Sequence, residues 1–171
     1  VTRLLTGTET QGDALRYGEA DRPGGPPRQA SVHLRPIVVW NTTRRCNLAC
    51  IHCYSSSENA VYPGELTTQQ AEAFIDDLGE YGIPVLLFSG GEPMMREDLI
   101  HLISYAKGRG LRPVISTNGT LLNNIRVGEL KAAGISQIGI SVDGIWGVND
   151  RFRGRKGAFE DALHGIRVSL G

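Results

Sequence analysis

The sequence lacks the features that mark membrane, secreted or nucleic-acid-binding proteins. It has no apolar run near the roughly 18 residues that span a bilayer, and its N-terminus lacks the apolar core of a signal peptide. Lysine plus arginine and aspartate plus glutamate balance at 18 each, so no basic excess points to nucleic acid. These absences predict a cytoplasmic protein with neither a membrane nor a nucleic-acid partner.

Cysteine is also scarce, and its spacing is more informative than its number. The chain has three cysteines, Cys46, Cys50 and Cys53, in the order Cys-x3-Cys-x2-Cys. An odd number in so short a span does not suit a disulfide framework. A [4Fe–4S] cluster normally takes four thiolates, so three would leave one iron open to another ligand.

Two other roles for these cysteines stay open on spacing alone. A structural zinc site needs four closed ligands, often as paired C-x2-C knuckles, and no second knuckle follows. His52 as a fourth zinc ligand would adjoin Cys53 and strain the geometry. Inert buried cysteines are the remaining alternative. The spacing favours a three-cysteine iron–sulfur site.

Composition and size indicate one globular unit with a distinct leader. The chain has 171 residues, of which 40% are hydrophobic and 21% charged. Residues 1–30 show no sustained apolar period and include Gly24-Gly25-Pro26-Pro27, which predicts a flexible N-terminal leader. Residues 31–171 are expected to form the folded core.

After Pro36 the chain alternates between strand and helix signals. Short apolar runs predict strands over 37–40, 84–88, 112–116 and 137–142. Helical spacing predicts helices beginning at Thr67 or Thr68, over 96–107, over 121–133 and from Ala158 onward. Continuous apolar strands joined through helices are typical of a parallel sheet, so the predicted class is α/β.

Each distinctive motif follows the end of a predicted strand. The cysteines follow the first strand and Gly90-Gly91-Glu92-Pro93 follows the second. Thr117-Asn118-Gly119 follows the third strand, and Asp143-Gly144 follows the fourth. The C-terminal ends of parallel strands share one rim, where such folds bind ligands. The motifs are therefore expected to meet at one site.

The cysteine motif followed by Gly-Gly-Glu-Pro resembles the radical S-adenosylmethionine (SAM) superfamily, over about residues 36–170. The resemblance implies an enzyme with a TIM-like (β/α) barrel, of which about four of six βα units are present. It also implies a [4Fe–4S] cluster on Cys46, Cys50 and Cys53, with SAM on the open iron. An electron, supplied by a reductant such as ferredoxin or flavodoxin, would cleave SAM to a 5′-deoxyadenosyl radical that abstracts hydrogen from substrate.

The resemblance assigns the glycine-rich motif to the SAM ammonium. Backbone carbonyls of Gly90-Gly91-Glu92-Pro93 and the Glu92 side chain would accept hydrogen bonds from that ammonium, the glycines would allow close approach, and Pro93 would fix the turn. An ordinary βα turn is the alternative for the same residues.

Further rim residues have implied roles towards SAM. His52 would pack near the adenine, and Ser141 would reach the ribose or the carboxylate. Arg153 would pair with a carboxylate of SAM or substrate. The implied set of further SAM-facing residues is His52, Ser116, Asn118, Ser141 and Asp143. The alternatives are a loop histidine, turn or cap residues and a solvated arginine.

The segments around these motifs resemble the haem-biosynthesis branch of the superfamily. The resemblance covers residues 35–46, 53–55 and 87–96. That branch includes didecarboxysiroheme deacetylase and a related enzyme of the dioxo-haem pathway. It implies a tetrapyrrole substrate that loses acetate or propionate side chains. Arg44 and Arg45 would suit such carboxylates, or be solvated loop charges.

Two other functions stay open. A peptide-modifying maturase with an extra C-terminal cluster domain shares the same rim motifs, and an inactive cluster-binding remnant would keep the cysteines. The family usually has a cysteine-rich C-terminal extension, whereas this sequence begins with Val1, ends at Gly171 and has no cysteine after Cys53. We therefore expect a fragment with its cluster and SAM ligands present and much of the substrate wall missing.

Overall fold

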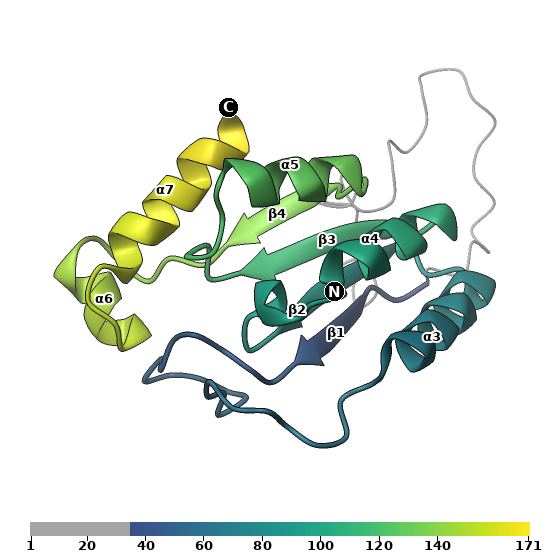
Figure 1. Ribbon diagram of the computed structural model, residues 1–171, viewed down its shortest axis with the longest axis horizontal. Coiled ribbons are helices and arrows are strands. Elements are labelled where there is room, and N and C mark those ends of the chain that lie inside the picture. Colours follow the sequence, from purple (N-terminus) through teal and green to yellow (C-terminus); the bar gives the residue numbers. More distant parts are fainter. Residues whose placement is uncertain (1–34) are drawn as a thin grey trace, which may run out of the picture.

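A sheet of four parallel strands, in the order β1-β2-β3-β4, forms the centre of the molecule (Figure 1). The strands are β1 (Val38–Thr43), β2 (Val85–Gly90), β3 (Arg112–Thr117) and β4 (Gln137–Ile140). The structure is a computed structural model that describes residues 35–171. The predicted leader over residues 1–30 lies outside the described residues. The parallel pairing confirms the predicted α/β class.

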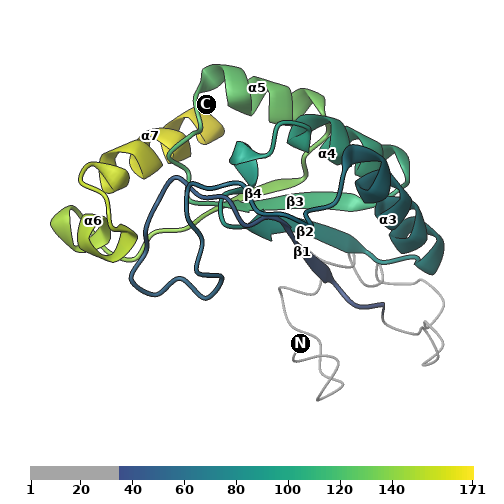
Figure 2. The same ribbon diagram turned by 60° about the horizontal axis from the view of Figure 1, so that its bottom comes forward.

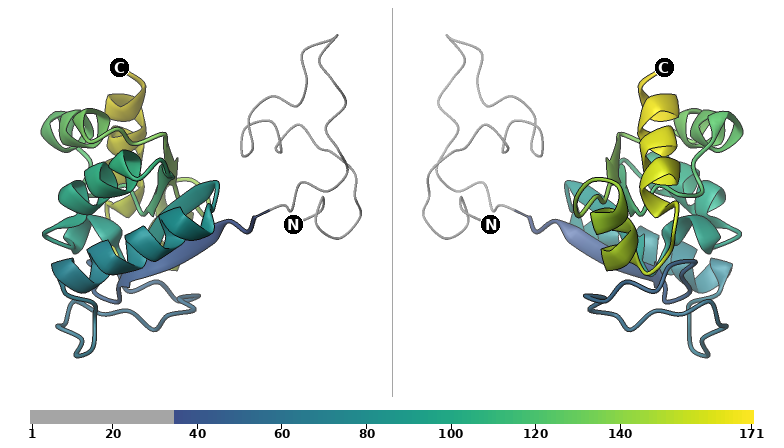
Figure 3. Two further views of the ribbon diagram at one scale, coloured as in Figure 1. Left: turned by 90° about the vertical axis from the view of Figure 1, so that its right-hand side faces the viewer. Right: turned by 90° about the vertical axis from the view of Figure 1, so that its left-hand side faces the viewer.

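One helix after each strand packs on the same face of the sheet (Figure 2). These helices are α3 (Thr68–Tyr81), α4 (Leu99–Gly108), α5 (Asn124–Ala132) and α7 (Ala158–Leu170). A short helix, α6 (Gly147–Arg153), lies at the C-terminal ends of the strands, and a 3-10 turn, η1 (Pro93–Met95), follows β2. Seen from those ends, α6 and α7 lie beside the long segment between β1 and α3 (Figure 3). The strand ends are therefore covered by loops and α6.

The main core lies between the sheet and the helices. Leu86 and Phe88 of β2 and Ile115 of β3 are fully buried. They point to the same face because Phe88 pairs with Ile115 in the parallel register and strand side chains alternate between faces. Ile75 of α3 and Leu102 of α4 close the core from the helix side. Replacing such a buried phenylalanine by alanine lowers the free energy of unfolding by about 3–5 kcal/mol. This packed layer therefore holds the strand ends in place.

The start of α3 confirms the predicted cap. Thr67 Oγ1 accepts the Gln70 N–H at 3.3 Å, and Gln70 Oε1 accepts the Thr67 N–H at 2.9 Å. This reciprocal pair satisfies two helix-end donors. The helix ends at Gly82, whose φ of 79° is the left-handed conformation that glycine adopts without strain.

Several predicted element bounds were wrong, and one helix was not predicted. The helix predicted over 96–107 begins at Leu99, because Asp98 receives the Arg96 guanidinium instead of joining the helix. The strand predicted over 137–142 ends at Ile140. Helix α6 was not predicted, because exposed residues such as Val148 give it no apolar period.

Among the helices described for residues 35–171, none combines the length and the apolar composition needed to span a lipid bilayer.

Candidate functional site

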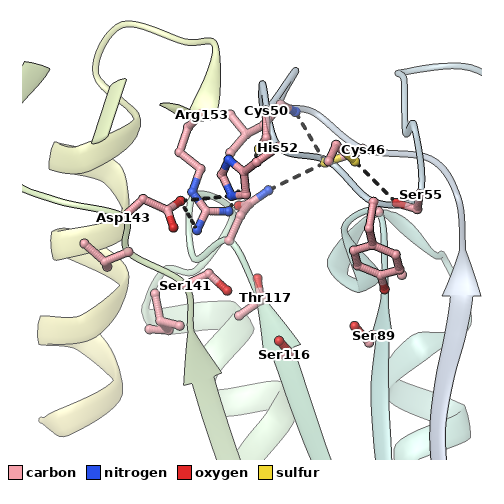
Figure 4. A pocket seen from close by; sticks show the side chains of 18 residues that line it. Cys46, Cys50, His52, Ser55, Ser89, Ser116, Thr117, Ser141, Asp143 and Arg153 are labelled. Atoms are coloured by element: carbon pink, nitrogen blue, oxygen red, sulfur yellow. Dashed lines mark hydrogen bonds and ion pairs between the residues drawn. The ribbon is translucent and has the colours of Figure 1, made fainter. Parts of the chain in front are cut away.

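A cavity of about 510 Å³ opens at the C-terminal ends of the strands (Figure 4). Its wall takes residues from the cysteine loop, from the ends of β2, β3 and β4, and from α6. All but two of the site residues named from sequence line it: Cys46, Cys50, His52, Cys53, Gly90, Gly91, Ser116, Asn118, Ser141 and Asp143. Glu92 and Pro93 are buried behind the wall.

The three thiols each receive a hydrogen bond from a different segment. Cys46 Sγ accepts from the Leu48 N–H at 3.5 Å and from Asn118 Nδ2 at 3.9 Å. Cys53 Sγ accepts from the Ser57 N–H at 3.4 Å, and Cys50 Sγ accepts from an arginine nitrogen described below. Donors aimed at sulfur favour the thiolate, which is the form that binds iron.

The pKa values of two thiols differ in direction because their surroundings differ. Burial opposes ionisation of Cys53, but hydrogen bonds from Ser55 and Ser57 outweigh it and lower the pKa of that thiol to about 7. Burial raises the pKa of Cys46, against the opposing effect of the Leu48 N–H. The more open end of the loop therefore presents the more easily ionised thiol.

Two arginines hold the cysteine loop in shape. Arg44 Nε donates to the Ser55 carbonyl at 2.9 Å, and its Nη2 donates to the Ser56 carbonyl at 3.1 Å. Arg45 Nε donates to Asn59 Oδ1 at 2.9 Å. Both guanidinium groups thus bind the segment that follows Cys53, a loop-fixing role that the sequence did not indicate.

The two glycines at the end of β2, Gly90 and Gly91, make room for the backbone before Cys46. A Cβ on Gly90, whose φ is 139°, would lie 2.2 Å from the Thr43 carbonyl oxygen. A Cβ on Gly91 would lie 2.5 Å from the Arg45 carbonyl oxygen. The N–H of Gly91 donates to the Thr43 carbonyl at 2.8 Å across this contact. The glycines therefore seat the cysteine loop on β2, besides lining the cavity.

Glu92 connects the end of β2 to the end of β3. Its fully buried carboxylate accepts from Thr117 Oγ1 at 2.7 Å, from the Asn118 N–H at 2.7 Å and from the Met94 N–H at 3.0 Å. Burial raises the pKa of this carboxyl, while the three donors oppose the rise. In this structure Glu92 acts behind the cavity wall, by placing Asn118.

Small hydroxyl side chains line the sheet side of the cavity. Ser116 and Ser141 were predicted, and Ser89 of β2 joins them. Ser89 was missed because it falls between the strand predicted over 84–88 and the Gly-Gly motif, and β2 in fact runs on to Gly90. Its alternation with the buried Phe88 is the signal that could have placed it on the open face.

The donor set fits an iron–sulfur cluster. Three sulfur atoms, the soft ligands that such clusters require, line one cavity wall. Within residues 35–171 no three Cys, His, Asp or Glu side chains converge around a single ion. A cluster needs no such convergence, because each thiolate binds a different iron atom. The loop therefore suits a cluster better than one zinc ion.

A sequence model of the radical SAM superfamily matches residues 40–169. This chain belongs to the radical SAM superfamily. Radical SAM proteins use a [4Fe–4S] cluster together with SAM, which agrees with the predicted cofactors. The match covers most of β1, all of β2, β3 and β4, and the cavity wall, and it confirms the predicted family, fold and enzyme class.

Curated relatives of this radical SAM chain include enzymes named for haem synthesis. It is 49% identical to Fe-coproporphyrin III synthase of Methanosarcina barkeri over 97% of this chain and 42% of that protein. It is 45% identical to pre-heme d1 synthase of Dinoroseobacter shibae over 83% of this chain and 35% of that protein. The radical SAM chain spans less than half the length of these relatives.

A peptide maturase and a solved structure are also similar to this radical SAM chain. The mycofactocin maturase MftC of Mycobacterium ulcerans is 38% identical over 75% of this chain and 33% of that protein. The crystal structure of Streptococcus suis SuiB bound to S-adenosylmethionine superposes with a TM-score of 0.64, at 18% identity, over 79% of this chain and 32% of that one. The superposition confirms the fold, of which this chain contains a part.

Proposed function

We propose that this chain is the radical-generating part of an enzyme of alternative haem biosynthesis, acting on a haem-precursor tetrapyrrole. The observation that carries the proposal is the meeting of three thiols and four serines at one cavity, in a chain 49% identical to an Fe-coproporphyrin III synthase. The reaction class is removal of acetate or propionate side chains from the porphyrin precursor.

The cavity residues divide between cluster and SAM. Cys46, Cys50 and Cys53 hold the cluster, and Gly90 and Gly91 place their loop. The cofactor pair supplies reductive cleavage of SAM to methionine and a 5′-deoxyadenosyl radical, which is beyond side-chain acid–base chemistry.

The remaining wall residues are suited to orient SAM. His52, on the loop, has an exposed ring next to the cavity, where it can pack on an adenine. Ser116, Ser141 and Asp143, at the strand ends, offer hydroxyl and carboxylate groups to polar parts of SAM. Asn118 faces the same space, while Glu92 and Pro93 support it from behind. Direct contact of Glu92 with the SAM ammonium, predicted from sequence, would need the carboxylate to leave its three buried donors.

The proposed enzyme needs an electron donor and a reducing compartment. A small carrier such as ferredoxin or flavodoxin suits a cluster that must be reduced one electron at a time. A cytoplasmic location suits free thiols and an oxygen-sensitive cluster. Neither nucleic acid nor membrane is included among the proposed partners.

The second candidate is a peptide-modifying maturase. It is favoured by the 38% identity to mycofactocin maturase, which is lower than the 49% identity to the haem-pathway relative. The two candidates differ in substrate, a tetrapyrrole or a partner peptide. A third candidate, an inactive remnant, would keep the cluster loop without turnover.

The test begins with anaerobic reconstitution of the chain, with a variant carrying alanine at all three cysteines as control. We expect four irons per chain in the wild type, an electron paramagnetic resonance (EPR) signal that changes on adding SAM, and 5′-deoxyadenosine with dithionite. We expect little conversion of didecarboxysiroheme by the 171-residue chain alone, since it spans 42% of the relative. A cluster signal unaffected by SAM would contradict the proposal. Binding of a peptide in place of the tetrapyrrole would favour the maturase.

A further inference from the structure

Helix α6 lies directly against the cysteine loop. The Phe152 carbonyl accepts the Ile51 N–H at 2.9 Å. A Cβ on Gly154 would lie 2.1 Å from the Ala49 carbonyl oxygen, so the two backbones touch. Contacts on both sides of Arg153 therefore fix where its side chain leaves the helix.

The Arg153 guanidinium joins a thiol to a carboxylate (Figure 4). Its Nη1 donates to Cys50 Sγ at 3.9 Å, and its Nη2 donates to Asp143 Oδ2 at 2.6 Å. The Arg153 side chain is 12% exposed, and its Nε is buried without a partner among the residues that the structure describes. Asp143 Oδ2 also lies 3.4 Å from His52 Nε2. The planar guanidinium is thus held between the cysteine loop and the segment that follows β4.

The donor to Cys50 differs in charge from the other thiol donors. Cys46 receives its hydrogen bonds from a backbone N–H and from the amide of Asn118, which are neutral. Cys53 is bonded to the N–H of Ser57 and the hydroxyl of Ser55, also neutral. A guanidinium keeps its charge at every working pH. Cys50 is therefore placed beside a permanent positive charge.

Such a charge acts on electron transfer more than on ligand geometry. Reduction adds one negative charge to an iron–sulfur cluster, and hydrogen bonds and charge near its sulfurs help to set the reduction potential. A positive group favours the reduced state, and a carboxylate next to that group offsets part of the effect. Because Arg153 is mostly buried, solvent screens its charge less than it would screen a surface arginine.

We propose that Arg153 is a positioning residue that donates to the Cys50 thiolate and raises the reduction potential of the cluster, with Asp143 as its counter-charge. This inference rests on the cluster-binding role of Cys50 in the proposed function. It assigns α6 a role in electron acceptance that is separate from substrate recognition.

The test measures the potential directly, without SAM. Wild-type, Arg153→Gln and Asp143→Asn chains are reconstituted anaerobically. Each is titrated with dithionite in the presence of redox mediators while EPR follows the reduced cluster. Arg153→Gln is expected to lower the potential, and Asp143→Asn is expected to raise it. The expected size for Arg153→Gln is roughly a tenfold change in the ratio of reduced to oxidised cluster at fixed potential, or 59 mV for one electron.

Two further variants separate charge from packing. Arg153→Lys keeps the charge and is expected to stay closer to the wild-type potential than Arg153→Gln. Arg155→Gln is the matched control, because Arg155 follows α6 and pairs with Asp161 at 2.6 Å instead of a thiol. Its potential should equal that of the wild type. Iron content and far-ultraviolet circular dichroism establish that each variant is loaded and folded.

Several results would overturn the inference. One is an Arg153→Gln potential equal to that of Arg155→Gln, and another is a downward shift in Asp143→Asn. If Arg153→Gln binds no iron, Asp143→Asn and Arg153→Lys decide: an Asp143→Asn potential at or below the wild type refutes the proposal. Full iron binding by Cys50→Ala would instead refute the underlying role of Cys50, so the two failures are distinguishable.

Discussion

The carboxylate of Glu92 accepts the backbone N–H of Asn118 at 2.7 Å inside the protein. Thr117, the neighbouring donor to the same carboxylate, lies 25 residues after Glu92 in the sequence. This contact joins the ends of β2 and β3 directly behind the cavity wall. In this structure Glu92, which was predicted to accept from the SAM ammonium, supports the residues that line the cavity.

Glu92→Gln is expected to destabilise the fold by about 1–3 kcal/mol, the cost of leaving a buried donor unpaired. Glutamine offers one acceptor oxygen where Glu92 accepts three donors. Urea unfolding checks this value. The matched control is Glu65→Gln, since Glu65 is exposed and, among residues 35–171, accepts only from Thr43 and Arg44. An equal loss in both variants would contradict the prediction.

The same carboxylate predicts a pH dependence. Burial raises the folded-state pKa of Glu92 above its ordinary value. Its contribution to stability is therefore full below the unfolded pKa, about 4.3, and is lost as pH rises through the folded pKa. The wild type should lose stability relative to Glu92→Gln as pH rises from the unfolded pKa, about 4.3, to neutrality. Urea midpoints of both proteins across that range provide the measurement, and a gap that widens with pH would refute it.

Cys53 is expected to alkylate faster than Cys46 in the metal-free chain at neutral pH. Burial opposes ionisation of Cys53, but the Ser55 and Ser57 donors outweigh it and lower the pKa of that thiol to about 7. The reaction rate of Cys53 with iodoacetamide should rise with pH to a plateau just above that value, while the buried Cys46 reacts more slowly. Mass spectrometry of timed samples gives each rate. Ser55→Ala should move the Cys53 midpoint upward, and an unchanged midpoint would exclude the hydroxyl as a cause.

Gly91→Ala is expected to abolish cluster uptake. The new Cβ would lie 2.5 Å from the Arg45 carbonyl oxygen and would push the cysteine loop off β2. Iron counting after anaerobic reconstitution checks the result. Gly128→Ala, in α5 with no heavy atom within 4 Å of the added Cβ, is the control. It should bind iron normally and stabilise the fold by about 0.5–1 kcal/mol.

Arg96→Ala is expected to lower the free energy of unfolding by about 3–5 kcal/mol, as for a broken buried ion pair. The Arg96 side chain is 8% exposed and donates to Asp98 at 2.6 Å and to the carbonyl oxygens of Thr42 and Leu66 at 2.9 Å. Its loss would release the end of β1 from the start of α3 and α4. Chemical denaturation measures the change.

Arg126→Ala serves as the control for Arg96. Its partner Glu129 lies 3.7 Å away, one turn along α5, and both side chains are more than 40% exposed. Such surface pairs contribute less than about 1 kcal/mol. Similar losses at the two positions would show that the Arg96 network adds nothing beyond a surface charge.

The sequence predicted the features that depend on local pattern. Buried strands such as β2 are continuous apolar runs, and the Thr67 cap is local, so both were placed closely. The rim was predictable because parallel strands end on one edge, which brings Ser116 and Ser141 beside the cysteines.

Other features were not predictable, because they depend on contacts distant in sequence. Nothing near Glu92 indicates that its side chain would turn towards Asn118. Helix α6 has no apolar period of its own, and its place depends on the contact of Gly154 with Ala49. The link between Arg153 and Cys50 spans 103 positions, beyond the reach of any local pattern.

That separation also has a consequence for biogenesis. The backbone N–H of Ile51 is satisfied by the carbonyl of Phe152, so the cysteine loop gains its last anchor only after the ribosome has synthesised α6. The arrangement of the three thiols is therefore complete only when the end of the fourth βα unit has folded against the cysteine loop.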